Sequence, residues 1–167
     1  SGKKKKESRQ YWGHIYVVVD RLGQLAAVNS IGTERLLAGV VPAEIFASAP
    51  LEALKAQSVT ARGAIFAKLG HTNLGDPFHI CATQLCQVYG GANYEQPTTN
   101  RAIEETRGLL AVRPRKDTGE PLRLVDSVYS SSSGGFTEAN EVVWDNAASE
   151  SLRPKLDANA HDPAIAK

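Results

Sequence analysis

The sequence predicts an α+β fold, in which β-hairpins and helices are mixed around one core. The observations behind this class are a β-branched run near the N-terminus, a long amphipathic stretch in the middle, and no regular alternation of strands and helices. A chain of 167 residues suits one domain. We expect that domain to span 11–158, with a disordered basic tail over 1–10 and a frayed end over 159–167.

The charge distribution excludes several classes of protein. The formal net charge is +1, so nothing in the overall charge favours nucleic acid as a partner. The one basic run, Lys3 to Lys6, is typical of a solvated tail, with binding to an anionic wall polymer or a membrane surface as the alternative. No stretch approaches the roughly 20 apolar residues of a membrane span, and no signal peptide opens the sequence.

The N-terminal third predicts a hairpin followed by a short helix. Residues 15–19 have the β-branched and aromatic content of a strand, and 24–29 form a second strand after a turn that ends at Gly23. A helix begins near Thr33 and should end near Gly39, because Pro42 cannot donate the next backbone hydrogen bond.

A long helix over 50–69 is the clearest element. Pro50 suits its first turn, and Gly70 suits the position just past its end. Spacings of three and four predict one buried stripe made of Leu51, Leu54, Ser58, Ala61, Ile65 and Leu69. A different stripe carries two cations, Lys55 and Arg62, on one face.

Shorter elements follow. Residues 71–91 are rich in Gly, Asp, Asn and Thr and predict a loop. Asn100 should cap a helix over 101–107 that Gly108 ends. A second hairpin is expected from 109–112 and 121–129, around a turn that contains Asp117, Thr118 and Gly119.

Three segments carry side chains suited to chemistry or binding. Glu44 lies between apolar residues of 40–46, and desolvation raises the pKa of a carboxyl group in such surroundings, as a general acid requires. A surface glutamate at a helix entrance is the alternative. The loop 130–135 holds four serines and two glycines, which suits a polyhydroxylated ligand, or else a flexible linker.

The two cysteines leave several roles open. Cys81 and Cys86, with His79 close in sequence, suit a zinc site, a disulfide or two free thiols. A cysteine nucleophile with His71 or His79 as its base is a further alternative. No phosphate loop, dinucleotide fingerprint or serine-hydrolase elbow is present.

Four segments in this order, within 28–44, 50–62, 86–89 and 129–144, resemble the SpoIID family, which includes stage II sporulation protein D and the LytB-like amidase enhancers. The resemblance implies a lytic transglycosylase that cleaves the MurNAc–GlcNAc bond of peptidoglycan and leaves 1,6-anhydro-MurNAc ends. It places the family's catalytic glutamate, the last residue of a Pro-x-Glu motif, on Glu44. One carboxyl group then serves as acid and as base, with no second carboxylate to activate water.

The resemblance also implies partners and a location. Expected substrate contacts are Lys55, Gln57, Arg62, Gln87, Tyr89, Tyr129, Ser131 and Ser133. The first three are expected to line the cleft or to hold Glu44 and its loop in place. No cofactor is required, although a structural zinc on Cys81, Cys86 and His79 is an alternative; relatives with zinc tend to carry His where this chain has Leu85. The partners expected are glycan strands stripped of their peptides, and a cell-wall amidase if the chain is an enhancer that binds without cutting. Either role is extracytoplasmic, and needs an export segment outside this sequence.

Overall fold

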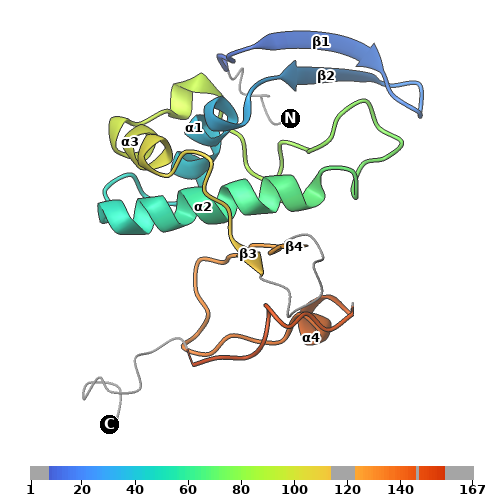
Figure 1. Ribbon diagram of the computed structural model, residues 1–167. Coiled ribbons are helices and arrows are strands. Elements are labelled where there is room, and N and C mark those ends of the chain that lie inside the picture. Colours follow the sequence, from blue (N-terminus) through green and yellow to red (C-terminus); the bar gives the residue numbers. More distant parts are fainter. Residues whose placement is uncertain (1–7, 114–122, 146, 157–167) are drawn as a thin grey trace, which may run out of the picture. The chain divides into compact units, whose positions relative to one another are not determined.

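The computed structural model describes residues 8–113, 123–145 and 147–156 (Figure 1). The α+β class is confirmed, because helices occur together with two small antiparallel strand pairs. Where the sequence predicted one domain over 11–158, the chain forms two compact units that divide after Ser127. The first unit holds the three longer helices, and each unit is described by itself below.

The predicted N-terminal hairpin is confirmed. Strand β1 (His14–Val19) pairs antiparallel with β2 (Leu25–Ser30). The turn depends on Asp20, whose Oδ1 accepts hydrogen bonds from the backbone N–H groups of Leu22 and Gln24, both at 2.8 Å. Gly23 completes it with a φ of 75°, which a residue with a side chain rarely adopts.

Helix α1 (Thr33–Glu44) is longer than predicted, since it continues through Gly39 and Pro42. The prediction that it ends near Gly39 is therefore wrong. Pro42 lies in the last turn, where its missing N–H costs one hydrogen bond. The five residues 37–41 before it are all buried, and their burial outweighs that loss.

Gly39 serves close packing and does not stop the helix. Its carbonyl accepts the N–H of Gly90 at 3.0 Å, so the loop backbone lies directly against α1. A Cβ at this position would lie 2.6 Å from Tyr89 Cε2 and 2.9 Å from the Gly91 carbonyl oxygen. Only glycine therefore allows this loop to approach the helix.

Helix α2 (Leu51–Lys68) confirms the long helix, and Gly70 follows it with a φ of 74°. Four residues of the predicted stripe are buried, namely Leu54, Ser58, Ala61 and Ile65. Leu51 and Leu69, at its two ends, stay partly exposed. Ala61 and Ile65 join the core made by α1, Tyr89 and Ile103.

Helix α3 (Pro97–Glu105) begins earlier than predicted, so Asn100 lies inside it and does not cap it. Pro97 is the reason, because a proline ring already has the φ of a first helical turn and lacks only an N–H that would be unbonded there. Gly108 follows with a φ of 73°, close to the predicted end. A short 3₁₀ turn, η1 (Ala92–Tyr94), precedes the helix.

The second hairpin is confirmed but short. Strand β3 (Val112–Arg113) pairs antiparallel with β4 (Arg123–Leu124). A further backbone bond, from Val125 N–H to the Ala111 carbonyl at 2.9 Å, extends the pairing by one step. The predicted turn at 117–119 lies outside the described residues.

The second unit contains a helix that the sequence did not predict, α4 (Asn140–Trp144). Arg153 folds back onto it, with an ion pair to Glu141 and a hydrogen bond to Asn140 Oδ1 at 2.9 Å. The guanidinium beside Glu141 lowers the pKa of that carboxyl to about 2. A bridge between Phe136 and Leu156 closes the unit, while the expected frayed end over 159–167 lies outside the described residues.

The expected basic tail is partly folded. Residues 1–7 lie outside the described residues, but Gln10 is held at both backbone groups. Its carbonyl accepts the N–H of Ala92 at 2.7 Å, and its N–H donates to Asn93 Oδ1 at 2.5 Å. The prediction of disorder is therefore wrong at position 10, because this segment pairs with the η1 turn. No helix among the described residues is long and apolar enough to cross a membrane.

Substituting Gly39 by Ala should lower the free energy of unfolding by about 2 kcal/mol, because the new methyl group overlaps the Tyr89 ring and the Gly91 carbonyl. Urea denaturation of parent and variant measures the change. Gly32→Ala is the control, since a Cβ there meets no atom within 4 Å. Equal stability of Gly39→Ala and the parent would show that the loop does not pack on α1 as described.

Candidate functional site

Glu44 is the last residue of α1 and is partly exposed. Its Oε1 accepts the backbone N–H of Val88 at 3.0 Å, a contact between residues 44 positions apart. Within the described part of the chain, Oε2 accepts no hydrogen bond and Glu44 forms no ion pair. Val88 also lines a cavity of about 450 Å³ with Thr83, Gln84 and Leu85. One carboxylate oxygen is therefore anchored while the other is available, next to a residue that lines an open cavity.

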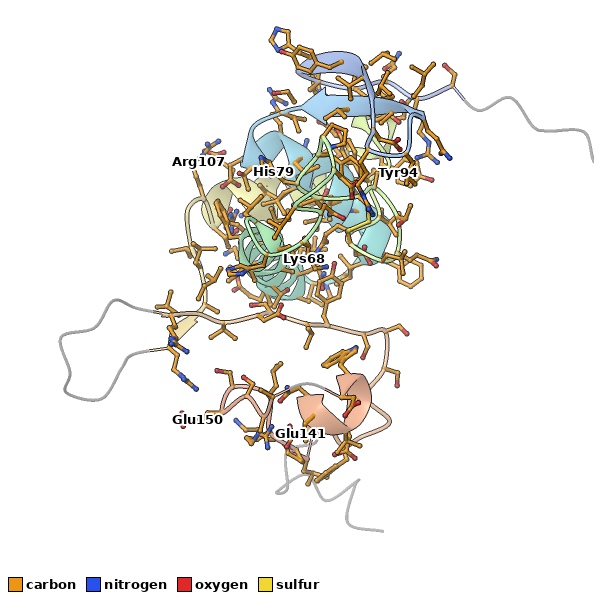
Figure 2. The ribbon with its side chains drawn as sticks, turned by 90° about the vertical axis from the view of Figure 1, so that its right-hand side faces the viewer. Lys68, His79, Tyr94, Arg107, Glu141 and Glu150 are labelled. Atoms are coloured by element: carbon orange, nitrogen blue, oxygen red, sulfur yellow. A yellow bond between two sulfur atoms is a disulfide. The ribbon has the colours of Figure 1, made fainter. Side chains whose placement is uncertain are left out.

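A disulfide joins Cys81 to Cys86 and closes the loop that leads into Val88. Lys68, labelled in Figure 2, is the last residue of α2. Its ammonium donates to the Cys86 carbonyl at 2.9 Å, which ties this loop to the helix. The cross-link and the lysine together restrict the segment whose N–H holds Glu44. In the disulfide neither sulfur is a thiolate, so neither is a zinc ligand or a nucleophile.

The third predicted zinc ligand, His79, has an exposed side chain. Its carbonyl accepts a hydrogen bond from Asn73 Nδ2 at 3.0 Å. Among the described residues, no group of three or more His, Cys, Asp or Glu side chains lies close enough together to hold a metal ion. Of the three alternatives for the cysteines, the structure contains the disulfide.

Gln87 and Tyr89, predicted to contact sugar, are both buried. The Tyr89 ring packs on Gly39, and its hydroxyl donates to Asn29 Oδ1 at 3.3 Å. Burial raises the pKa of the Tyr89 hydroxyl. The segment turns both side chains into the core and leaves the Val88 N–H facing Glu44, and their contact with sugar stays a prediction.

Lys55, expected to line the cleft or to hold Glu44 and its loop, joins α2 to α3. Its Nζ donates to Glu105 Oε2 at 2.7 Å and to Glu52 Oε1 at 2.8 Å. Glu105 is the main cause, and Glu52 the second, of a raised pKa for the Lys55 ammonium. Gln57 differs from Lys55, because its Nε2 is shielded from solvent and donates to no acceptor in the described ranges.

Arg62, also expected in the cleft, is buried, with 1% of its side chain exposed. Its guanidinium binds both carboxylate oxygens of Glu34, with Nη2 to Oε2 at 2.7 Å and Nε to Oε1 at 3.1 Å. Nη1 donates to the Leu109 carbonyl at 3.1 Å, and Nη2 also donates to the Ile103 carbonyl at 3.5 Å. Arg62 of α2 therefore binds α1, α3 and the segment that leads into β3.

The remaining predicted contacts, Tyr129, Ser131 and Ser133, lie in the second unit, whereas Glu44 lies in the first. The serine loop is folded on itself. Ser133 Oγ accepts the N–H of Gly135 at 3.2 Å, and Ser132 Oγ accepts the N–H of Gly134 at 3.2 Å. These bonds favour a fixed loop over the flexible linker.

Sequence reasoning missed the Val88 N–H and Asn29. A backbone amide has no residue-type signature, so no motif could have identified Val88. Asn29 Nδ2 donates to the Trp12 carbonyl at 2.8 Å and its Oδ1 accepts from Tyr89, so it connects the N-terminal segment to the loop. For Asn29, the available signal was its position as a polar residue near the end of an otherwise apolar strand.

Comparisons with known proteins identify the family of this chain. The model of the SpoIID family, described as "Stage II sporulation protein", matches residues 21–112, a range that includes Glu44, α2 and Val88. The chain therefore belongs to the SpoIID family.

Two relatives extend the match beyond that range. An amidase enhancer of Bacillus subtilis is 39% identical over 129 residues, which cover 77% of this chain and 16% of the relative. An uncharacterized protein of Brachyspira hyodysenteriae is 30% identical over 136 residues, which cover 81% of this chain and 34% of the relative. The chain thus spans about a sixth and about a third of the length of these two relatives.

Replacing Arg62 by Met should lower the free energy of unfolding by about 3 kcal/mol, because it leaves the Glu34 carboxylate and the part-buried Leu109 carbonyl without their donor. Urea denaturation checks this value. Arg101→Ala, which removes an exposed arginine paired with Glu105, should cost less than about 1 kcal/mol. Equal losses in the two variants would contradict the structural role of Arg62.

Alkylation of the native, non-reduced chain should add no mass, because both cysteines are in the disulfide. After reduction, two alkyl groups should be added, one for each of the two cysteines. Mass spectrometry reads both states. Labelling without reduction, or cysteines that become reactive only after a chelator removes zinc, would favour the thiol or the metal alternative.

Proposed function

We propose that this chain acts on the bacterial cell wall as a lytic transglycosylase domain, with Glu44 as its single general acid and base. The observation that carries the proposal is the state of the Glu44 carboxylate. One oxygen is held by the Val88 N–H at 3.0 Å, and the other accepts nothing from the described residues. A group held at one oxygen keeps its orientation while the other transfers a proton, and such positioning is required of a catalytic acid.

The reaction uses the same carboxyl group twice. Protonated Glu44 donates its proton to the glycosidic oxygen as the bond from that oxygen to C1 of MurNAc breaks. The carboxylate so formed then accepts the proton of the C6 hydroxyl, whose oxygen attacks C1 and closes a 1,6-anhydro ring. Glu44 ends protonated again, and no water is consumed.

The proposed scheme differs from hydrolysis in the number of carboxyl groups that it needs. An inverting hydrolase needs a second carboxylate to activate water, and a retaining one needs a second carboxylate as nucleophile. Glu44 is the one acidic residue of the segment 35–51, which supports a mechanism that uses a single carboxyl group.

The proposed substrate and location follow from the family. Membership in SpoIID supports glycan strands of peptidoglycan, stripped of their peptides, as the substrate. These strands lie outside the cytoplasmic membrane, so we place the domain there. The Cys81–Cys86 disulfide fits that setting, because disulfides persist in oxidising compartments.

The name of the Bacillus subtilis relative supports a second function. That protein is called an amidase enhancer, which favours a domain that binds glycan and assists a cell-wall amidase without cutting. The two functions share a substrate and differ in whether Glu44 transfers a proton.

Substituting Glu44 by Gln should lower the release of anhydro-MurNAc ends by at least about 100-fold, because the amide keeps the size of the side chain but neither donates nor accepts the proton. Mass spectrometry of digests of peptide-stripped glycan strands measures the products. Glu52→Gln is the matched control, since it makes the same change at an exposed carboxylate of α2 and should leave the rate within about twofold.

Other products would decide between the alternatives. Reducing ends, heavier than anhydro ends by one water, would show hydrolysis and contradict the single-carboxylate mechanism. Strands that bind to the folded parent but are not cut would favour the enhancer function.

A further inference from the structure

The hairpin of β1 and β2 presents apolar side chains to solvent. Opposed residues of an antiparallel pair lie on the same side of a sheet, and the register pairs Val17 with Ala27 and Val19 with Leu25. One side, called the aliphatic face below, therefore carries Ile15, Val17, Val19, Leu25 and Ala27. The four larger side chains are 51–78% exposed. A cluster of exposed apolar side chains of this size marks a surface that contacts a partner.

The hairpin turn adds two exposed leucines. Leu22 lies in the turn, and Leu74 lies in the loop after α2. Arg21 of the turn pairs with Asp76 of that loop, with Nε and Oδ1 3.2 Å apart, so the segment that carries Leu74 is held beside the turn. The Asp20 carboxylate is bonded to backbone N–H groups of the turn. Both charged side chains of the turn thus have partners within the chain, which lowers the cost of contact with an apolar phase.

Positive charge is concentrated in the same part of the sequence. Residues 1–30 hold two carboxylates, Glu7 and Asp20, and six cations, namely Lys3, Lys4, Lys5, Lys6, Arg9 and Arg21. Their net charge is +4, whereas the whole chain has +1, so the remaining residues carry −3. This asymmetry favours an anionic partner for the N-terminal region. It also disfavours a second copy of the chain, because two such regions repel each other.

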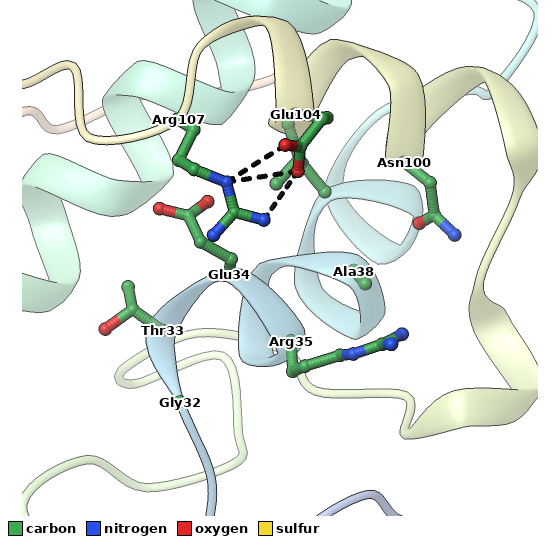
Figure 3. Close-up of a pocket in the computed structure, with 9 residues that line it drawn as sticks. Gly32, Thr33, Glu34, Arg35, Ala38, Asn100, Glu104 and Arg107 are labelled. Carbon is green, nitrogen blue, oxygen red and sulfur yellow. Dashed lines mark hydrogen bonds and ion pairs between the residues drawn. The ribbon is translucent and has the colours of Figure 1, made fainter.

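Arg35 adds a cation beside the start of β1. Its guanidinium lies over the Trp12 ring, 5.0 Å from the centroid, and Trp12 is half exposed. Figure 3 shows the Arg35 side chain pointing away from Glu34 and from the Glu104–Arg107 pair, so neither carboxylate pairs with it. An indole ring next to a cation is typical of side chains that lie at a membrane–water interface.

We propose that the aliphatic face and the hairpin turn bind the surface of a membrane that contains anionic lipids. The apolar side chains need an apolar phase, and the excess of positive charge needs an anionic one. The boundary between lipid headgroups and acyl chains supplies both, while an anionic polymer supplies charge alone. A partner protein would cover one side of the hairpin, but Tyr16 on the opposite side and Leu22 in the turn are exposed as well.

The backbone of the hairpin limits how deeply it enters. Within the described part of the chain, β1 and β2 form a sheet of two strands, so each has an outer edge without a neighbouring strand (Figure 1). Unpaired N–H and C=O groups are too costly in the hydrocarbon interior. The hairpin therefore lies at the interface, where water reaches its edges, and its apolar side chains enter by about 5–10 Å. This proposal goes beyond the cutting of glycan and does not depend on Glu44.

Flotation of the 167-residue chain with lipid vesicles tests the surface. Vesicles of phosphatidylcholine with about a third of phosphatidylglycerol should bind it at least about tenfold more tightly than phosphatidylcholine alone. Val17→Thr combined with Val19→Thr keeps the β-branched shape and should weaken binding by about tenfold. The matched control, Val142→Thr with Val143→Thr, makes the same change at exposed valines of α4 and should bind like the parent.

The basic run is tested in the same assay. Replacing the four residues Lys3 to Lys6 by Gln should weaken binding to the anionic vesicles by at least about tenfold. A parent chain that does not float with these vesicles would overturn the proposal. Equal losses in the two valine pairs would overturn it too. A loss on removing the lysines but none in the Val17 and Val19 variant would favour an anionic polymer instead.

A second readout uses the parent chain alone, so it does not depend on how a variant folds. In NMR spectra with bicelles that contain spin-labelled lipid, the amide signals of β1, the turn and Leu25 should lose the most intensity. Intensity loss centred on other exposed apolar residues, such as Phe46 or Leu85, would overturn the assignment of this surface. Light scattering that shows a dimer, lost in the Val17 and Val19 variant, would assign the aliphatic face to a second copy and contradict lipid binding.

Discussion

The contact between Arg62 and Glu34 is the constraint on which the first unit depends. Burying a guanidinium is costly unless a carboxylate and further acceptors replace the lost water. Arg62 meets this condition through both oxygens of Glu34 and through the carbonyls of Ile103 and Leu109. These partners belong to the start of α1, to α3 and to the segment before β3. One side chain of α2 thereby fixes the direction of α1, whose last residue is the proposed catalytic Glu44.

Glu44 is positioned by loop backbone and not by another side chain. The loop that provides the Val88 N–H is held by the Cys81–Cys86 disulfide, by Lys68, and by the close approach of Tyr89 and Gly90 to Gly39. A backbone donor cannot change rotamer, so it orients the carboxylate at little entropic cost. The site therefore tolerates a loop that is poor in regular structure.

Residues that looked like ligand contacts turned out to support the fold. Lys55 and Arg62 share a face of α2, as their spacing predicts, but that face lies against α3 and the start of α1 instead of a cleft. Gln87 and Tyr89 flank the contact with Glu44 yet point into the core. The motif over 86–89 indicated the segment that contacts Glu44. The direction of each side chain depends on packing against distant residues, which spacing in the sequence does not reveal.

The sequence by itself determined the α+β class, the first hairpin, helix α2 and Glu44 as the candidate acid, because these follow from local periodicity, turn residues and motif order. Tertiary structure decided the rest. It extended α1 through Pro42, started α3 at Pro97, and paired the two cysteines. It also brought Val88 to Glu44 across 44 positions and Glu95 to both Trp12 and Asn100. Such contacts depend on which distant segments share a core, and local patterns carry no information about that choice.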